Sequence, residues 1–220
     1  MRIKTFHILI FLSLISLKGY AQNQTLGFGL GGAAFKGETS DDVASIAEEI
    51  GVQSHLYYAL ALRDERWQFM AQINYNRILA EIDVNSVNGQ LISYSTASQH
   101  YFGAIGMRFY IAADTRQYLP KRGDSAPFLG AHLGATFFNN ETNSPIFNGG
   151  DNITVKDGQS YDLAFQAEVG YRYYLNDAWS LEANANFRHG TNDLWDGLGG
   201  QTEFNDWIIS LAFGFAVQLN

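Results

Sequence analysis

The chain has 220 residues, contains no cysteine and carries a formal charge of −8 at pH 7. Its length is enough for one domain or one barrel, and the missing cysteine excludes disulfides and cysteine-linked lipid anchors. The acidic balance argues against a nucleic-acid partner, because phosphates require a basic footprint.

The first segment, residues 1–21, has the composition of a secretory signal peptide. Arg2 and Lys4 precede an apolar run of about 12 residues, which is too short to span a bilayer as a helix. We expect cleavage after Ala21, with an uncleaved anchor as the alternative. The leader holds three basic residues and no acidic ones, so the mature chain, residues 22–220, carries 11 Lys+Arg against 22 Asp+Glu.

Beyond the leader, apolar and polar side chains alternate in eight segments. The last segment is the clearest, because Trp207 and every second residue up to Leu219 are large and apolar, whereas the residues between them are mostly small or polar. Side chains of a strand point alternately to its two faces, so this period of two predicts strands. The eight expected strands cover residues 26–35, 52–62, 67–76, 101–111, 128–138, 161–173, 179–188 and 207–220.

The connections between these segments also alternate in length. Short connections at 64–66 and 176–178 contrast with four long polar segments, and only the connection at 112–126 is longer than its side would require. The long segments are 37–51, 82–98, 139–160 and 190–205. Each of them follows an odd-numbered strand, so all four lie on one side. The pattern predicts an all-β protein, an eight-stranded antiparallel transmembrane up-and-down β-barrel with outward-facing long loops.

Which face of the barrel meets lipid follows from the residue types on each face. A soluble barrel would bury the apolar face, but the polar face is rich in glycine, which suits a narrow lumen better than a solvated surface. The apolar face carries almost no charge in mid-strand, and aromatic residues stand near its strand ends. These expected girdle residues are Trp67, Tyr171, Tyr173, Trp179 and Trp207. We therefore expect lipid contact across this face, in the outer membrane of a Gram-negative cell.

The polar face also carries charged groups that the pattern directs into the lumen. The predicted lumen network is Arg108, His132, Glu168, Arg172, Glu182 and Arg188. Charges confined in a narrow lumen must pair, because unpaired burial is costly. A plug of ion pairs is the favoured interpretation, and an ion path lined by the same groups is the alternative.

Catalytic and metal chemistry have little support in the sequence. No serine-containing motif marks a nucleophile, and no segment has the ligand spacing of a calcium loop. His189 with Asp193 and Asp196 would be the candidates for a hydrolase at the barrel rim, and this hypothesis ranks last. We expect no enzyme activity, no metal and no cofactor.

The C-terminal third contains short motifs that resemble a known family. Residues 192–197 read Asn-Asp-Leu-Trp-Asp-Gly, and 205–207 read Asn-Asp-Trp at the start of the last strand. The pattern resembles the small barrels of Bacteroidota that include the type IX secretion component PorG, and the whole chain resembles outer-membrane barrels of the OmpX and OmpA type. The residues carrying the motif are Asp193, Asp196, Gly197, Asn205, Asp206 and Trp207.

This resemblance implies a non-enzymatic structural or scaffold barrel. Its implied partners are periplasmic or outer-membrane assembly proteins, and an accessory role in a type IX-like secretion machinery is the specific hypothesis. The alternative is a narrow porin-like channel for ions or small solutes.

Overall fold

The structure is a computed structural model. It describes residues 24–36, 50–62, 66–85, 91–111, 123–143, 154–155, 158–191, 195, 198–199 and 206–219. The predicted leader lies outside these residues, as do Asp193, Asp196, Gly197 and Asn205 of the C-terminal motif. The described part of the chain contains no helix of the length and apolarity that a transmembrane helix requires.

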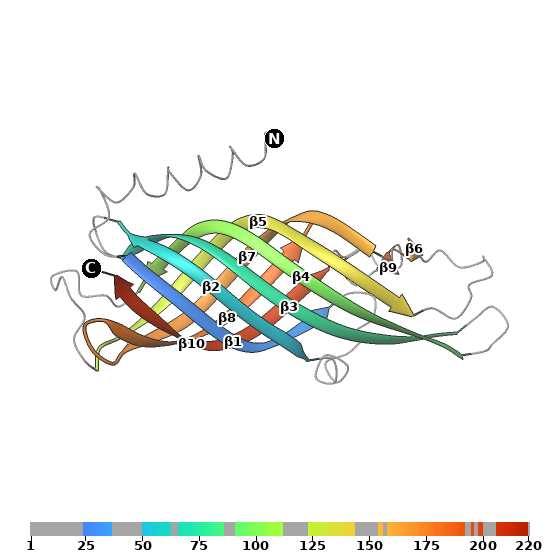
Figure 1. Ribbon diagram of the computed structural model, residues 1–220, viewed down its shortest axis with the longest axis horizontal. Coiled ribbons are helices and arrows are strands. Elements are labelled where there is room, and N and C mark those ends of the chain that lie inside the picture. Colours follow the sequence, from blue (N-terminus) through green and yellow to red (C-terminus); the bar gives the residue numbers. More distant parts are fainter. Residues whose placement is uncertain are drawn as a thin grey trace.

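Eight of the strands close into one antiparallel barrel, and two further short strands pair with each other (Figure 1). The strands are β1 (Gln24–Lys36), β2 (Gly51–Ala61), β3 (Trp67–Asn85), β4 (Leu91–Tyr110), β5 (Ser125–Asn143), β6 (Thr154–Val155), β7 (Gly158–Tyr174), β8 (Trp179–Gly190), β9 (Leu198–Gly199) and β10 (Trp207–Leu219). The order around the barrel is β1-β10-β8-β7-β5-β4-β3-β2, so each strand pairs with its sequence neighbours in the barrel and β10 closes on β1. The predicted fold class is confirmed.

Two short connections mark one end of the barrel, which we call the turn end. Leu62 N–H donates to the carbonyl of Trp67 in the β2–β3 connection at 2.8 Å. Between β7 and β8, the Asn176 side chain accepts hydrogen bonds from the N–H groups of Ala178 (2.9 Å) and Trp179 (2.8 Å). An asparagine that binds the backbone two and three residues ahead stabilises a tight turn. The opposite end, where β1 leads to β2 and β3 leads to β4, is called the loop end.

The alternation of residue types translates directly into alternating exposure. In β10, Leu211 and Phe213 are 51% and 63% exposed, whereas Ala212 between them is 1% exposed. The same pattern runs through the other long strands, with large apolar side chains outside and small or polar ones inside. The outer surface is therefore a continuous apolar belt. Such a belt is the expected surface of a barrel in lipid rather than in water.

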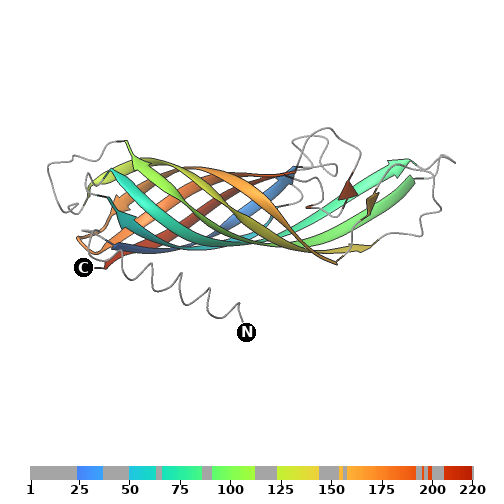
Figure 2. The same ribbon diagram turned by 90° about the horizontal axis from the view of Figure 1, so that it is seen from above.

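At the loop end, several strands extend into segments that were expected to be loops. The segment 82–98 was expected to be a loop, but β3 continues to Asn85 and β4 begins at Leu91, with pairing up to Asn85↔Leu91. Figure 2 shows this β3–β4 arm extending beyond the rest of the barrel. Part of the expected 139–160 loop is likewise strand, in β5 and β7, and β6 pairs with β9. Polar residues outside the membrane can line both faces of a strand, so the apolar alternation that identified the other segments is absent there.

Candidate functional site

A network of buried charges crosses the lumen nearer the turn end. Arg108 on β4 donates to Glu168 on β7 (Nη2 to Oε1, 2.8 Å) and to Glu182 on β8 (Nη1 to Oε1, 3.1 Å). Arg172 also donates to Glu182. These four side chains are at most 6% exposed. Two guanidinium groups and two carboxylates thus balance in charge, and we call this set, together with Tyr57, the carboxylate network.

Tyr57 was not predicted as part of this arrangement. Its hydroxyl donates to Glu182 Oε2 at 2.7 Å and accepts from Arg172 Nη2 at 2.8 Å, so β2 is tied to β7 and β8 across the barrel. Its partner on β1 is Gly27, and a Cβ added to Gly27 would lie 2.2 Å from the Tyr57 ring. The glycine therefore provides the space that the ring occupies.

Further polar groups contact the Glu168 carboxylate. His132 Nε2 lies 3.2 Å from Glu168 Oε2, and Asn184 Nδ2 donates to Glu168 Oε1 at 2.9 Å. The Arg108 guanidinium also lies over the Phe128 ring, 3.9 Å from its centroid. Multiple hydrogen bonds to each ion are what makes buried ion pairs tolerable. Five of the six predicted lumen residues therefore meet in one cluster.

Arg188, the sixth, lies apart from them. It donates to Gln166 Oε1 from Nε (3.2 Å) and Nη2 (3.0 Å), and to Asn76 Oδ1 from Nη1 (3.3 Å). Its guanidinium lies 4.1 Å from the centroid of the Phe102 ring. Arg188 and Glu182 share a face of β8, but six residues of strand separate them by roughly 20 Å. Facing the same lumen does not bring them into contact.

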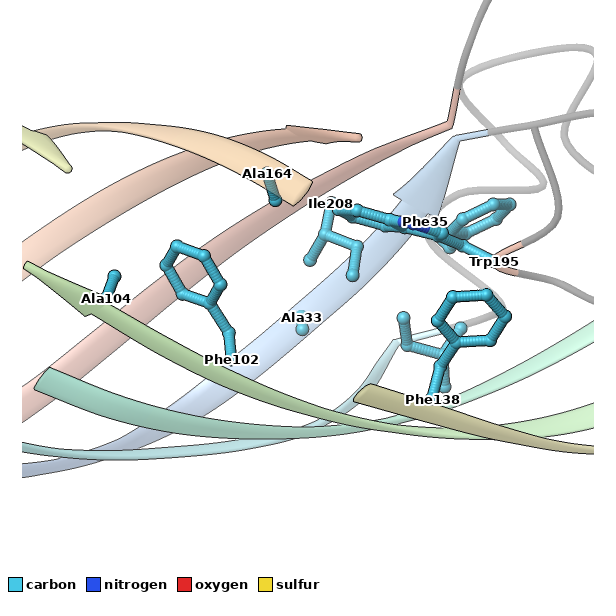
Figure 3. Close-up of a cluster of buried hydrophobic side chains, with 9 residues drawn as sticks. Ala33, Phe35, Phe102, Ala104, Phe138, Ala164, Trp195 and Ile208 are labelled. Carbon is cyan, nitrogen blue, oxygen red and sulfur yellow. The ribbon is translucent and has the colours of Figure 1, made fainter. Parts of the chain in front are cut away.

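Closer to the loop end, an apolar cluster fills the lumen (Figure 3). Trp195, from the segment between β8 and β10, is fully buried there with Phe35, Phe138 and Ile208. Its indole N–H donates to Asp162 Oδ2 at 3.0 Å, and its backbone N–H donates to Asp206 Oδ2 at 2.6 Å. We call Trp195, Phe35, Phe138 and Ile208 the Trp195 plug.

The polar partners of Trp195 link the plug to the strand ends. Ser98 on β4 donates to the Trp195 carbonyl at 2.8 Å, and Asp162 on β7 also accepts from the N–H of Thr191 at 2.8 Å. Gly190 leaves room for the indole, since an added Cβ would lie 2.5 Å from it. In the C-terminal motif, Asp206 thus holds a tryptophan that the prediction did not assign to the lumen.

The aromatic residues of the outer face form groups at both ends of the belt. Trp67, Tyr171, Tyr173 and Trp179 stand toward the turn end, and the Trp67 ring centroid lies 4.7 Å from that of Phe109. Trp207 stands toward the loop end, stacked with His189 at 4.0 Å. A further row toward the loop end follows the strand pairing and was not predicted. It contains Tyr75, Tyr101, Phe137 and Tyr161.

The rim hydrolase hypothesis rests on residues that the structure only partly describes. His189 faces outward on β8 against Trp207, while Asp193 and Asp196 lie outside the described residues. Among the residues that are described, no three His, Asp or Glu side chains are grouped so as to hold a metal ion.

The chain is similar in sequence or fold to known outer-membrane proteins. No family model matches the chain. Outer membrane protein W of Vibrio cholerae is 25% identical over 196 residues, which cover 81% of each chain. The crystal structure of Neisserial surface protein A (NspA) has a TM-score of 0.54 at 10% identity, covering 88% of this chain and 96% of that one. The second likeness is one of fold.

The similarities and the fold agree on location. The chain forms a closed barrel with an apolar outer belt, and it is similar to an outer-membrane protein over most of its length. It therefore belongs in the outer membrane of a Gram-negative cell. The predicted localisation and its lipid surroundings are confirmed. The narrower resemblance to PorG-like secretion barrels stays a prediction.

Proposed function

We propose that this outer-membrane β-barrel is a closed, non-enzymatic scaffold that acts from its loop end rather than through its lumen. The observation that carries the proposal is the double obstruction of the lumen. The carboxylate network joins β2, β4, β7 and β8 at one level, and the Trp195 plug fills another level toward the loop end. Eight strands leave an interior only wide enough for side chains, and here polar and aromatic side chains occupy it.

The β3–β4 arm is the part of the scaffold best placed for contact with other molecules. Pairing between β2 and β3 ends at Val52↔Arg77, whereas pairing between β3 and β4 continues to Asn85↔Leu91. The arm therefore extends roughly 25 Å past the end of β2, at a strand rise of about 3.3 Å per residue. Beyond Ser95↔Asn143, where the β4–β5 pairing ends, the arm is a two-stranded hairpin. A hairpin anchored in a barrel presents its backbone to a partner at little entropic cost.

Planar-bilayer recording tests whether the lumen is closed. The wild-type protein, refolded and inserted at a measured density, should give no current steps above those of the bare bilayer. Steps that change in size when Arg172 or Glu182 is neutralised would contradict the closed scaffold and support the narrow channel. The same recording on Trp195→Ala should also stay silent, because the carboxylate network remains in place.

Affinity capture tests the role of the arm. Replacing residues 81–95 by Asn-Gly removes the arm and preserves the pair Ala80↔Thr96 on which the new turn is built. The matched control replaces only residues 86–90 by Asn-Gly and keeps the arm. Partners captured by wild type and control but lost without the arm support the proposal, and recovery of the barrel alone from all three would refute it.

The type IX accessory hypothesis predicts a different capture result. A barrel that docks to a periplasmic secretion ring would bind through its turn end. Periplasmic assembly proteins would then be captured equally by wild type, the armless variant and the control.

A further inference from the structure

Among the described residues, the lumen contains a third buried guanidinium, Arg188, that stands outside the ion pairs of the carboxylate network. Arg108 and Arg172 are matched by Glu168 and Glu182. Arg188 is 1% exposed, and within the described residues no carboxylate forms an ion pair with it. Its hydrogen-bond partners, the side-chain oxygens of Gln166 and Asn76, are neutral amides. A buried guanidinium with only neutral partners lacks the counter-charge that such ions require.

The side chains beside Arg188 offer hydrogen-bond donors without acceptors. Asn76 gives its Oδ1 to Arg188, which leaves its Nδ2 with no hydrogen-bond partner. Gln53 stands directly opposite Asn76 in the β2–β3 pairing, and neither atom of its amide has a partner. Both residues are 0% exposed. Side chains directly opposite on one face of two strands have Cβ atoms about 5 Å apart, so these amides lie in one region with Arg188.

This region lies between the two obstructions of the lumen. In the strand register, Arg188 stands opposite Gln166 of β7 and opposite Ile208 of β10, which belongs to the Trp195 plug. Glu168 stands one inward position closer to the turn end on β7. The region is thus shielded from water on both sides, where an unsatisfied charge is most costly.

From this charge, these free donors and this enclosure, we propose that the lumen beside Arg188 binds one small monovalent anion of the halide class. The guanidinium supplies the charge, and the amide nitrogens of Asn76 and Gln53 supply donors. A guanidinium without an ion-pair partner calls for a single negative charge, and a position enclosed between the carboxylate network and the Trp195 plug favours a small spherical anion over a larger solute. The anion enters as the barrel closes and is a structural component of the folded protein.

Anomalous scattering locates such an anion directly. Protein refolded in bromide and crystallised should show an anomalous peak within hydrogen-bond distance of the Arg188 guanidinium. A normal density peak without anomalous signal would identify water instead and would overturn the proposal. This measurement uses the wild-type protein and does not depend on any variant folding.

Linkage to folding gives a second readout. At constant ionic strength, replacing gluconate by chloride should stabilise the wild type. Above saturation, a tenfold rise in chloride should raise the ratio of folded to unfolded protein about tenfold. Arg188→Met should abolish this dependence, and Arg77→Met, at an exposed position on the outer face, should retain it. Equal dependence in wild type and Arg188→Met would refute the site, whatever the bilayer recordings show about conduction.

Discussion

Neutralising Glu182 should weaken the barrel more than any single surface change. Glu182 accepts hydrogen bonds from Arg108 (3.1 Å), Arg172 and Tyr57 (2.7 Å) at a buried position in the lumen. Glu182→Gln keeps the size of the side chain but leaves two guanidinium groups to share one carboxylate. Removing one partner of a buried ion pair costs about 3–5 kcal/mol, and we expect a loss of that size in the free energy of unfolding.

The assay is denaturant unfolding of the barrel refolded in lipid vesicles, followed by tryptophan fluorescence. Glu141→Gln, at an exposed carboxylate on the outer end of β5, is the matched control and should change stability by less than about 0.5 kcal/mol. Arg172→Met combined with Glu182→Gln restores the balance of charge, so the double variant should lose less than the sum of the two single losses. A Glu182→Gln loss below about 1 kcal/mol, or strict additivity, would refute the network as a coupled unit.

Three further variants test other parts of the structure. Gly27→Val should lower the free energy of unfolding by about 1–3 kcal/mol, because its Cβ would meet the Tyr57 ring. Gly103→Val is the control, since no atom lies within 4 Å of its new Cβ, and equal losses for the two variants would contradict the packing of Gly27 against Tyr57. A variant retaining only Trp195, with the other three tryptophans replaced by phenylalanine, should resist quenching by both acrylamide and brominated lipid; strong quenching by either would show that the indole is not in the lumen. Leu133→Arg, in the middle of the apolar belt and 64% exposed, should cost about 2–4 kcal/mol in vesicles, against about 0–1 for Asn139→Arg near the rim, and a reversed order would contradict lipid contact.

The sequence predicts the barrel well because its lipid-facing residues must be apolar at every second position. The alternation in β10 and β8 follows from that requirement, and the exposure of Leu211 and Phe213 matches it. Once the polar face is known to point inward, charges such as Glu168 and Arg172 have few other places to go. Their convergence could therefore be anticipated from pattern alone.

The sequence pattern does not predict contacts that depend on the position of a side chain along the barrel axis. Arg188 and Glu182 lie on one face of β8 at different levels, and only the strand register reveals the distance between them. Residue type alone does not place Tyr57 in the lumen, because Tyr58 beside it is also a tyrosine and either of the two could point inward. Trp195 stood in an expected loop, and its signal was a large apolar residue between two aspartates in a polar segment.

The extent of the β3–β4 arm was missed for a related reason. Beyond the membrane, lipid no longer imposes an apolar face, so segments such as 91–98 combine serine and threonine with isolated apolar residues. Their strand conformation is set by pairing with the neighbouring strand, which a single-strand pattern does not reveal.

A cysteine scan of β10 tests the filled lumen and the lipid-facing belt together. The chain has no cysteine of its own, so single cysteines can be placed at each position from 209 to 216. Outward positions, such as Leu211 and Phe213, should react only with a lipid-soluble thiol reagent. Inward positions, such as Ser210 and Ala212, should react with neither that reagent nor a water-soluble one. Labelling of Ser210 or Ala212 by the water-soluble reagent would show an open aqueous lumen and contradict the closed scaffold.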